Sequence, residues 1–359
     1  MRVLVVSPVH DPRDARVTER EIGALLDAGH EVTHVGPFSA CGVTPRSGVR
    51  PVDIPRSSGR KRMAALREAR RAVRREAPLH DVLLLHGPDA ALAAVGVSHP
   101  AIVWDVHEDT AAALSMRPWM PRPLARPVGA GVRWAEGRAE RSWHVLLAEH
   151  GYASRFARPH PVVPNTPVVP ESVLASGRGR AIYVGRLTRA RGAEELVDLG
   201  RALAQHGVVL EVIGNADPEV AEVVARAHAA GWIDWRGFVP NAEALARIEG
   251  ATVGVSLLRD EPNYRHSMPT KLLEYLSRGV PFVSTQLPLA VELARSSGAG
   301  VVVPFGGVAQ ACEAIIEIND DDRRRQAMAD SGRAWASAHA NWSVDGPAFV
   351  RQLEEWARA

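Results

Sequence analysis

Two arginines in the stretch YVGRLTRARG are spaced to bind an anion. Arg186 follows an apolar segment that ends at Gly185, and Arg191 stands five residues later beside Gly192. A helix is expected to begin near Ala193, and a helix start offers backbone N–H groups to negatively charged ligands. The two guanidinium groups add bidentate donors. This arrangement is typical of a diphosphate site, whereas the alternative is a loop that holds arginines only because the chain is rich in them.

The stretch HSMPTKLLEYLSRGVPFV, residues 266–283, predicts a second anion site at another helix start. Pro269 fits the first turn of that helix, where a missing N–H costs nothing. About one turn further on, the carboxylate of Glu274 can accept hydrogen bonds from two hydroxyl groups, such as those of a ribose. The alternative is an amphipathic helix in which Glu274 faces solvent. The N–H groups expected to point out of this helix start belong to Ser267, Met268, Thr270 and Lys271.

The composition describes a globular protein with no strong overall charge. Of its 359 residues, 46% are hydrophobic and 23% are charged, and the formal net charge is +2, so nothing indicates a nucleic-acid partner. Only Lys61 and Lys271 are lysines among the 43 basic residues, which a GC-rich coding bias explains. Cys41 and Cys312 form no metal-binding spacing and suit a reducing cytoplasm.

The hydropathy pattern predicts a cytoplasmic protein. No apolar run approaches the roughly 20 residues that a membrane span requires, and MRVLVVSPVH predicts a buried strand rather than a signal peptide. The basic helix expected over residues 60–76 would suit an anionic membrane surface, with the protein peripheral at the inner membrane face. Its apolar side is mostly alanine, which favours the alternative of a solvated helix.

Alternating strands and helices predict two α/β domains in tandem. Strand-like segments in the first half are RVLVVS, EVTHVG, DVLLLHG, AIVWDVH and HVLLAE, with helices over residues 14–28, 60–76, 89–97 and 132–142. Residues 164–180 are rich in Pro, Ser and Gly and form the best linker candidate. Further strands follow at AIYVGR, VVLEVIG, WIDWRG, ATVGVSLL, PFVST and AGVVVP. Short apolar strands between helices indicate parallel sheets covered on both faces, so we expect two doubly wound, Rossmann-like domains facing a cleft.

The expected boundaries place the first domain at residues 1–167 and the second at residues 168–338. A helical tail closes the chain, and its last part, residues 339–359, carries Phe349, Leu353 and Trp356 at helical spacing. We expect such an apolar stripe to pack against another part of the protein. A dinucleotide fingerprint is missing after the first strand, where SPVHDPRDAR contains no glycine, so a nicotinamide-dependent dehydrogenase is not indicated.

Several motifs in the same order resemble one enzyme family. YVGRL-x-x-x-R-G, WRGFVPN and P-T-K-L-L-E-Y-L-x-x-G-V-P-F-V resemble the C-terminal domain of retaining glycosyltransferases of family four, which have the GT-B fold. DARVTEREIGALLDAGHEVTHVG is similar to that family's first helix and second strand, and WDVHED resembles the strand that delivers a histidine to the cleft. NWSVDGPAF resembles the terminal helix that crosses back to the first domain. The resemblance covers nearly the whole chain.

The resemblance implies transfer of a hexosyl group from a nucleoside diphosphate sugar, with retention and without a metal or another cofactor. Arg186 and Arg191 would bind the diphosphate and stabilise it as it leaves. Phe238 and Val239 would lie beside the nucleobase, and Glu274 would bind the ribose. The family's implied donor-binding set in this sequence is Gly185, Arg186, Arg191, Phe238, Val239, His266, Ser267, Met268, Pro269, Thr270, Lys271 and Glu274.

The same resemblance assigns residues of the first domain. His107 would hydrogen-bond the transferring sugar or the leaving oxygen, which makes it a catalytic residue together with Arg186, Arg191 and Glu274. The acceptor, whether a small molecule, a glycan or a lipid-linked molecule, would be faced by His10, Asp11, Arg16, Asp105 and Glu108.

One residue departs from the family pattern. The family commonly has a glutamate eight residues before the ribose-binding acid, and here that place holds His266. Our hypothesis is an active enzyme with an altered pocket for the donor sugar. The alternatives are a GT-B nucleotide-sugar epimerase and an inactive module that binds sugar nucleotides as a scaffold.

Overall fold

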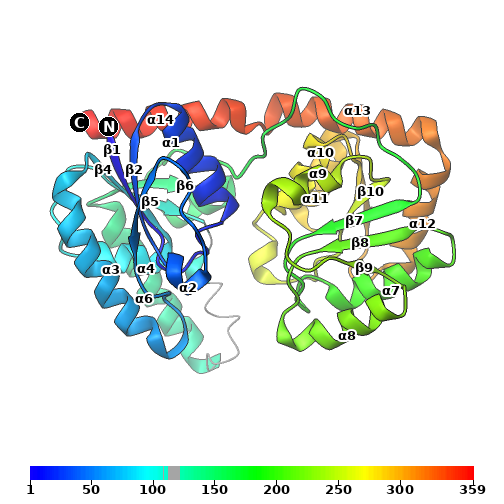
Figure 1. The fold of residues 1–359 in the computed structure, drawn as a ribbon, viewed down its shortest axis with the longest axis horizontal. Helices are drawn as coiled ribbons and strands as arrows, with labels where there is room; N and C mark the ends of the chain where they lie inside the picture. Colours follow the sequence, from blue (N-terminus) through cyan, green and yellow to red (C-terminus); the bar gives the residue numbers. More distant parts are fainter. Residues whose placement is uncertain (108, 112–121) are drawn as a thin grey trace. The chain divides into compact units, whose positions relative to one another are not determined.

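The computed structural model describes residues 1–107, 109–111 and 122–359. They form two compact units (Figure 1). Unit 1 comprises Met1–Asn165 and Ser343–Ala359, and unit 2 comprises Thr166–Trp342. Each unit has a six-stranded parallel sheet with helices on both faces, so the expected α/β class with two Rossmann-like domains is confirmed.

The sheet of unit 1 has the strand order β3-β2-β1-β4-β5-β6. Its strands are β1 (Arg2–Val6), β2 (Glu31–Gly36), β3 (Val49–Asp53), β4 (Val82–His86), β5 (Ile102–Val106) and β6 (His144–Leu147). The order reverses between β1 and β4. In open parallel sheets, ligands bind beyond the carboxyl ends of the strands at such a reversal.

The helices of unit 1 begin with an unusual element. Residues Ala15–Ile22 form a π-helix, η1, which continues as α1 (Gly23–Asp27), so the helix expected over residues 14–28 is present but differently wound. Asp14 caps it by accepting hydrogen bonds from the N–H groups of Arg16 and Val17, each at 3.0 Å. The other helical segments are α2 (Phe38–Cys41), η2 (Gly59–Lys61), α3 (Arg62–Glu76), η3 (Ala77–Leu79), α4 (Gly87–Ala94), α6 (Arg122–Glu140), η4 (His150–Arg155) and α14 (Trp342–Arg358).

Unit 2 repeats the same sheet order. Its strands run β12-β11-β10-β7-β8-β9, and the order reverses between β7 and β10. Their bounds are β7 (Arg180–Val184), β8 (Val209–Ile213), β9 (Asp234–Trp235), β10 (Val253–Ser256), β11 (Phe282–Thr285) and β12 (Gly300–Val303). Counted within their own unit, both sheets have the order 3-2-1-4-5-6 of dinucleotide-binding folds.

Two hydrophobic cores cover the two faces of the second sheet. One contains buried residues of α7 (Ala193–Ala204), α8 (Pro218–Ala229) and α12 (Val308–Asp320). The other contains residues of α9 (Asn241–Ile248), α10 (Thr270–Ser277), α11 (Pro288–Ser297) and α13 (Asp322–His339). The short helix η5 (Pro262–Tyr264) precedes α10. Apolar side chains therefore pack against both faces of the sheet.

The terminal helix α14 packs within unit 1. Phe349 and Leu353 are fully buried, and the Trp356 ring stacks on His144 with 4.6 Å between the ring centroids. The predicted stripe of three apolar residues thus docks on the first unit. The helical tail is not continuous, since α13 ends at His339 and α14 begins at Trp342.

Arginines of helix α3 form ion pairs with acidic residues of unit 1. Arg62 forms an ion pair with Asp89, and Arg71 pairs with Glu68 in the same helix. These contacts favour the solvated-helix alternative over membrane contact. No helix among the described ranges is both long and apolar enough to cross a bilayer.

Candidate functional site

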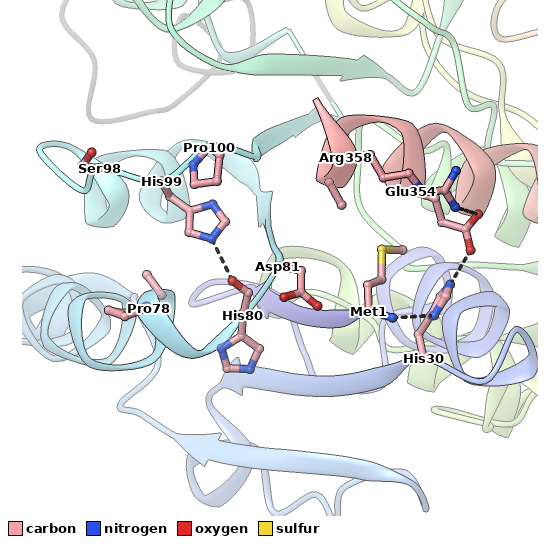
Figure 2. A pocket seen from close by; sticks show the side chains of 12 residues that line it. Met1, His30, Pro78, His80, Asp81, Ser98, His99, Pro100, Glu354 and Arg358 are labelled. Carbon is pink, nitrogen blue, oxygen red and sulfur yellow. Dashed lines mark hydrogen bonds and ion pairs between the residues drawn. The ribbon is translucent and has the colours of Figure 1, made fainter.

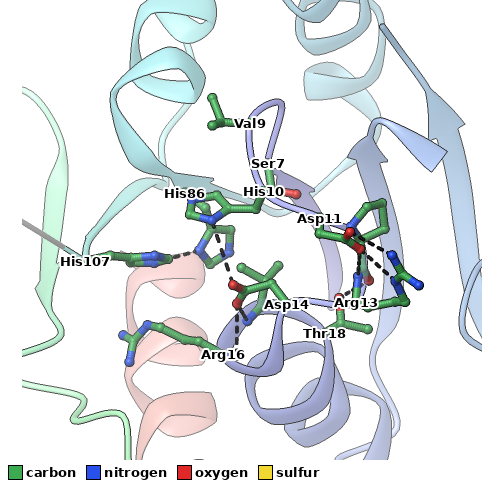
Figure 3. A network of polar contacts seen from close by, with 12 residues as sticks. Ser7, Val9, His10, Asp11, Arg13, Asp14, Arg16, Thr18, His86 and His107 are labelled. Carbon is green, nitrogen blue, oxygen red and sulfur yellow. Dashed lines mark hydrogen bonds and ion pairs between the residues drawn. The ribbon is translucent and has the colours of Figure 1, made fainter. Parts of the chain in front are cut away.

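A buried polar cluster lies at the strand-order reversal of unit 1. His86 ends β4, Asp105 belongs to β5 and His107 follows it, while Arg16 and Glu21 come from η1. The i→i+5 winding of a π-helix places Arg16 and Glu21 one turn apart, so both reach the same interior space. Figure 3 shows Arg16, His86 and His107 gathered beside His10 and Asp14.

Arg16 is committed to internal contacts. Its Nε and Nη2 donate to the two carboxylate oxygens of Asp105 at 2.9 and 2.8 Å, and its Nη1 donates to the Val163 carbonyl at 2.9 Å. Nε also lies 2.9 Å from Oε1 of Glu21. Arg16 and Asp105 are both buried, so their side chains face the interior of unit 1.

Asp105 connects this ion pair to His107. One Asp105 carboxylate oxygen contacts Nε2 of His107 and lies 3.3 Å from Nδ1 of His86. The His107 side chain is 15% exposed, and its ring lies 5.3 Å from that of His10, which is also partly exposed. The fold therefore brings His107, expected to contact the transferring sugar, together with His10, expected near the acceptor, at the edge of the buried cluster.

The charges in the cluster are set by burial and by Arg16. Burial alone would raise the pKa of Asp105, but the Arg16 guanidinium and His107 bring it well below its usual range. Burial raises the pKa of Glu21 well above its usual value, and the charge of Asp105 adds to this. Burial also lowers the pKa of His86 to about 4. At neutral pH the cluster therefore holds an Arg16–Asp105 ion pair and a neutral His86, and the environment of Glu21 favours its protonated form.

The cluster also has the donor set of a metal site. Ligand atoms of Glu21, His86, Asp105 and His107 all lie within 4.8 Å of one another. Two imidazoles and two carboxylates suit an ion such as zinc. The Arg16 guanidinium contacts both carboxylates, however, so a cation would have to displace it from them. The contacts fit a hydrogen-bonded network better than a metal centre.

Glu21 and His86 were not anticipated from the sequence. His86 follows VLLL directly, so a polar residue at the carboxyl end of a buried strand was the available signal. Glu21 stands beside Ile22 in the first helix, and its inward direction depends on the π winding. Asp11 forms an ion pair with exposed Arg13 and stays at the surface. Glu108 lies outside the described residues.

A cavity of about 600 Å³ lies at the opposite edge of the same sheet (Figure 2). Asp81 precedes β4 there, and Glu354 comes from α14. His30 lies 3.2 Å from the amino group of Met1 through Nδ1 and 3.1 Å from Glu354 through Nε2. These contacts attach α14 to the amino ends of the strands, away from the polar cluster at their carboxyl ends.

A second cluster lies at the strand-order reversal of unit 2. Gly185 directly follows β7 with a φ of 139°, and a Cβ atom placed there would lie 3.2 Å from Nζ of Lys271. Lys271 and Glu274 are each only 8% exposed. Glu274 therefore does not face solvent, and α10 directs both residues into the interior near the end of β7.

The hydroxyl of Tyr275 separates β7 from β10 at this point. The two strands pair only at Ala181–Val253 and Ile182–Gly254. Beyond these pairs, the Val184 N–H donates to the Tyr275 hydroxyl at 3.1 Å, and that hydroxyl donates to the Val255 carbonyl at 3.1 Å. A side chain thus takes the place of a strand-to-strand hydrogen bond, and the sheet opens where ligands are expected.

The two predicted diphosphate arginines have different surroundings. Arg186 is exposed, and its Nη2 donates to Asp217 at 3.0 Å with a second contact from Nε. Arg191 is partly buried, and its charge acts on the buried Lys271. A diphosphate would therefore have to compete with Asp217 for Arg186. Sequence reasoning gave no reason to expect Asp217 as the partner.

The start of α10 differs in detail from the prediction. Pro269 is the N-cap residue and not part of the first turn. The Ser267 N–H donates to the Tyr264 carbonyl at 3.4 Å, so it is already engaged in the turn that ends η5. His266 is exposed, while Met268 packs partly against the core. In the loop before α9, Phe238 is about half exposed and Val239 is partly buried.

The unit 2 cluster falls inside a stretch that is similar to a known family. Residues 178–321 match the model of the family described as "Glycosyl transferases group 1". The matched stretch is less than half of the chain and lies within unit 2. It contains β7, α10 and all residues of the second cluster. No curated protein sequence matches the chain.

Solved structures resemble the chain over its full length. Sucrose-phosphate synthase from Thermosynechococcus elongatus is 15% identical with a TM-score of 0.77, and the match covers 99% of this chain and 98% of that one. HepE from Anabaena, in complex with UDP and glucose, is 15% identical with a TM-score of 0.71 and 99% coverage of both chains. WaaG, a glycosyltransferase involved in lipopolysaccharide biosynthesis, is 13% identical with a TM-score of 0.66, covering 97% of this chain and 98% of its own. At these identities the likeness shows the fold, which is GT-B.

Proposed function

We propose that this protein is a glycosyltransferase that moves a sugar from a nucleoside diphosphate sugar to an acceptor. One observation carries the proposal: the basic residues Arg186, Arg191 and Lys271 lie at the strand-order reversal of unit 2, inside the stretch that matches the glycosyl transferases group 1 model. Parallel sheets bind ligands at that place. Since HepE was solved with UDP-glucose, UDP sugars are the first donors to test.

We assign the donor to unit 2. Arg186 and Arg191 bind the diphosphate, and Arg186 exchanges its contact with Asp217 for a phosphate oxygen. Glu274 accepts the ribose hydroxyls, and Phe238 and Val239 lie beside the base. Gly185, His266 and residues 267–271 complete the donor site. Positively charged side chains held in place stabilise the diphosphate as negative charge develops on it. A divalent metal ion has this role in other transferases, so we propose a metal-independent reaction here.

We assign the acceptor to unit 1. His107 and His10 are the partly exposed members of its cluster, and Asp11 lies near them at the surface. The buried Arg16–Asp105 pair holds His107 in place. The acceptor is a small molecule, a glycan or a lipid-linked molecule. We further propose retention at the anomeric carbon through front-side attack, with a diphosphate oxygen as base. The anomeric proton coupling of the product would report whether the configuration is retained.

A panel of sugar nucleotides tests the proposal through thermal unfolding. Ligands that bind only the folded state raise its melting temperature, so donors of one nucleotide class should raise Tm. With that donor, Arg186→Ala and Glu274→Ala should each lower turnover by about 100-fold or more, the usual cost of one preorganised electrostatic contact. Arg226→Ala is the matched control, since this exposed arginine of α8 forms a surface ion pair with Glu222 of the same helix. If no sugar nucleotide raises Tm, the proposal is wrong.

The same donor separates the two alternative functions. Incubation without any acceptor would yield an epimer if the protein were a nucleotide-sugar epimerase. A scaffold would bind the donor and release no free nucleotide with any acceptor class. A transferase should instead release nucleotide in proportion to glycosylated acceptor.

A further inference from the structure

The amine of Lys271 has no polar partner in the described part of the chain. Its Nζ is buried, makes no hydrogen bond and lies 3.6 Å from the centroid of the Tyr183 ring. Burying an ammonium ion costs several kcal/mol, and a cation–π contact returns only about 2 kcal/mol of it. A charged lysine without a polar partner is therefore energetically unfavourable at this site, so stability of the folded protein does not explain why a lysine is present.

The groups around Lys271 do not provide a salt bridge that would offset this cost. Arg191 in the loop after β7 repels its charge, and Glu274, one turn along α10, attracts it. The Tyr183 hydroxyl donates to the Arg186 carbonyl at 2.9 Å, so its proton is already used. Burial lowers the pKa of Lys271 well below its usual range, Arg191 lowers it further and Glu274 opposes them. In the described part of the chain, only the Tyr183 ring and the more distant Glu274 favour the charged form of Lys271, and its Nζ makes no hydrogen bond.

The backbone around the amine is built to admit it. Gly185 has a φ of 139°, a backbone conformation that glycine adopts without strain and other residues rarely adopt. A side chain at this position would crowd Nζ of Lys271. The same loop carries Arg186 and Arg191. Lys271 is the second residue of α10, so its flexible four-carbon stem begins at a helix N-terminus, where anions are favoured.

We propose that Lys271 is a third cation for the donor diphosphate, stored as a neutral amine on the face of Tyr183. When the diphosphate binds, Nζ takes a proton from solvent and bonds a phosphate oxygen as an ammonium ion. No covalent bond forms or breaks in this step. The inference rests on the proposed function, and it adds a residue whose charge appears only when the ligand is present.

The two-lysine composition makes the charge of Lys271 directly observable. Protein labelled with ¹³C at the lysine ε-carbon should give one signal from Lys271 and one from exposed Lys61. Lys61→Met and Lys271→Met assign them. In a pH titration without ligand, Lys271 should titrate well below Lys61. With saturating UDP near pH 8, roughly two units below an ordinary lysine pKa, its signal should move to the charged position.

Affinity for UDP provides the second readout. Lys271→Met should weaken UDP binding at least tenfold, and wild-type affinity should fall by up to about tenfold per pH unit as the pH rises through this range, because one proton is bound with the ligand. Without ligand, Lys271→Met should be as stable as the wild type or more stable, since it buries no amine. Lys271→Arg keeps a permanent charge and should bind UDP without the pH dependence.

The outcomes separate this inference from the proposed function. If wild-type protein binds UDP, but Lys271 has the same charge with and without it, the inference is overturned. Unchanged UDP affinity in Lys271→Met would overturn it as well. If UDP, GDP and ADP all fail to bind the wild type, the proposed function itself fails together with the inference.

Discussion

Arg16 and Asp105 form a bidentate ion pair that is almost completely closed to solvent. Its two hydrogen bonds are 2.9 and 2.8 Å long, and the side chains are 5% and 0% exposed. The pair joins the π-helix η1 to strand β5 and holds the carboxylate that contacts His107. We conclude that Arg16 and Asp105 are positioning residues for His107.

Asp105→Asn should destabilise the protein by about 3 kcal/mol. Removing one partner of a buried ion pair leaves the other charge uncompensated, which is far more costly than losing a surface pair. Urea denaturation near pH 7 measures the difference. Asp11→Asn is the matched control, because its Arg13 partner is exposed, and it should cost less than about 1 kcal/mol. Equal losses in the two variants would contradict a buried-charge explanation.

Acid should destabilise the protein through His34, which is buried in β2. Burial lowers its pKa to about 3, and nearby His86 and His10 contribute. The unfolded chain therefore binds a proton near pH 6.5 that the folded chain does not bind, so stability is lost as the pH falls from about 6.5 towards 3. Each such histidine contributes a slope of about 1.4 kcal/mol per pH unit in that window.

His34→Gln should reduce the pH dependence of the unfolding free energy by about 1.4 kcal/mol per pH unit, the contribution of one such histidine. Its Nε2 lies 2.6 Å from the Ser7 hydroxyl, so glutamine can replace the hydrogen bond without titrating. Denaturation at several pH values between about 4 and 7 gives both slopes. A variant whose stability depends on pH as steeply as the wild type would show that His34 is not the titrating group.

How far the sequence predicts the structure depends on how locally each feature is encoded. Strand β4 is a continuous apolar run and could be predicted directly. Strand β3 was missed, because VRPVD contains an arginine and a proline and lies at the edge of the sheet, where such residues are tolerated. A proline at an edge does not interrupt a central strand, so the local signal there resembles a loop.

The residues of the candidate site likewise differ in how well the sequence predicts their placement. The motifs proposed to bind the donor are short and contiguous in the sequence, whereas the inward placement of Glu21 depends on a π-helix that no local pattern indicated. The role of Lys271 depends on Tyr183, which is remote in the sequence and meets it only in the folded sheet. Residues whose environment is assembled from distant elements are the ones that sequence reasoning could not characterise.

Gly254→Ala should destabilise unit 2 by about 1–3 kcal/mol, the usual cost of overpacking. A Cβ atom at Gly254 would overlap the ring of Tyr275, whose hydroxyl bridges β7 and β10. The displaced ring should also weaken UDP binding, since the opening between the strands depends on it. Gly137→Ala is the control: this helical glycine has open space around it, and alanine there should stabilise the protein. Equal stability changes in the two variants, measured by denaturation, would contradict the packing argument.

His266→Ala should change the choice of donor sugar and leave nucleotide binding intact. His266 is exposed just before α10, eight residues ahead of Glu274, where the resembled family commonly has an acid that touches the sugar. The ratio of kcat/KM between two donors that share a nucleotide, such as UDP-glucose and UDP-N-acetylglucosamine, should shift about tenfold, equivalent to one hydrogen bond of about 1.4 kcal/mol. The Kd for UDP should not change. His206→Ala, at an exposed site after α7, serves as the matched control. If the ratio stays at the wild-type value in His266→Ala and also in His266→Glu, this residue does not select the sugar.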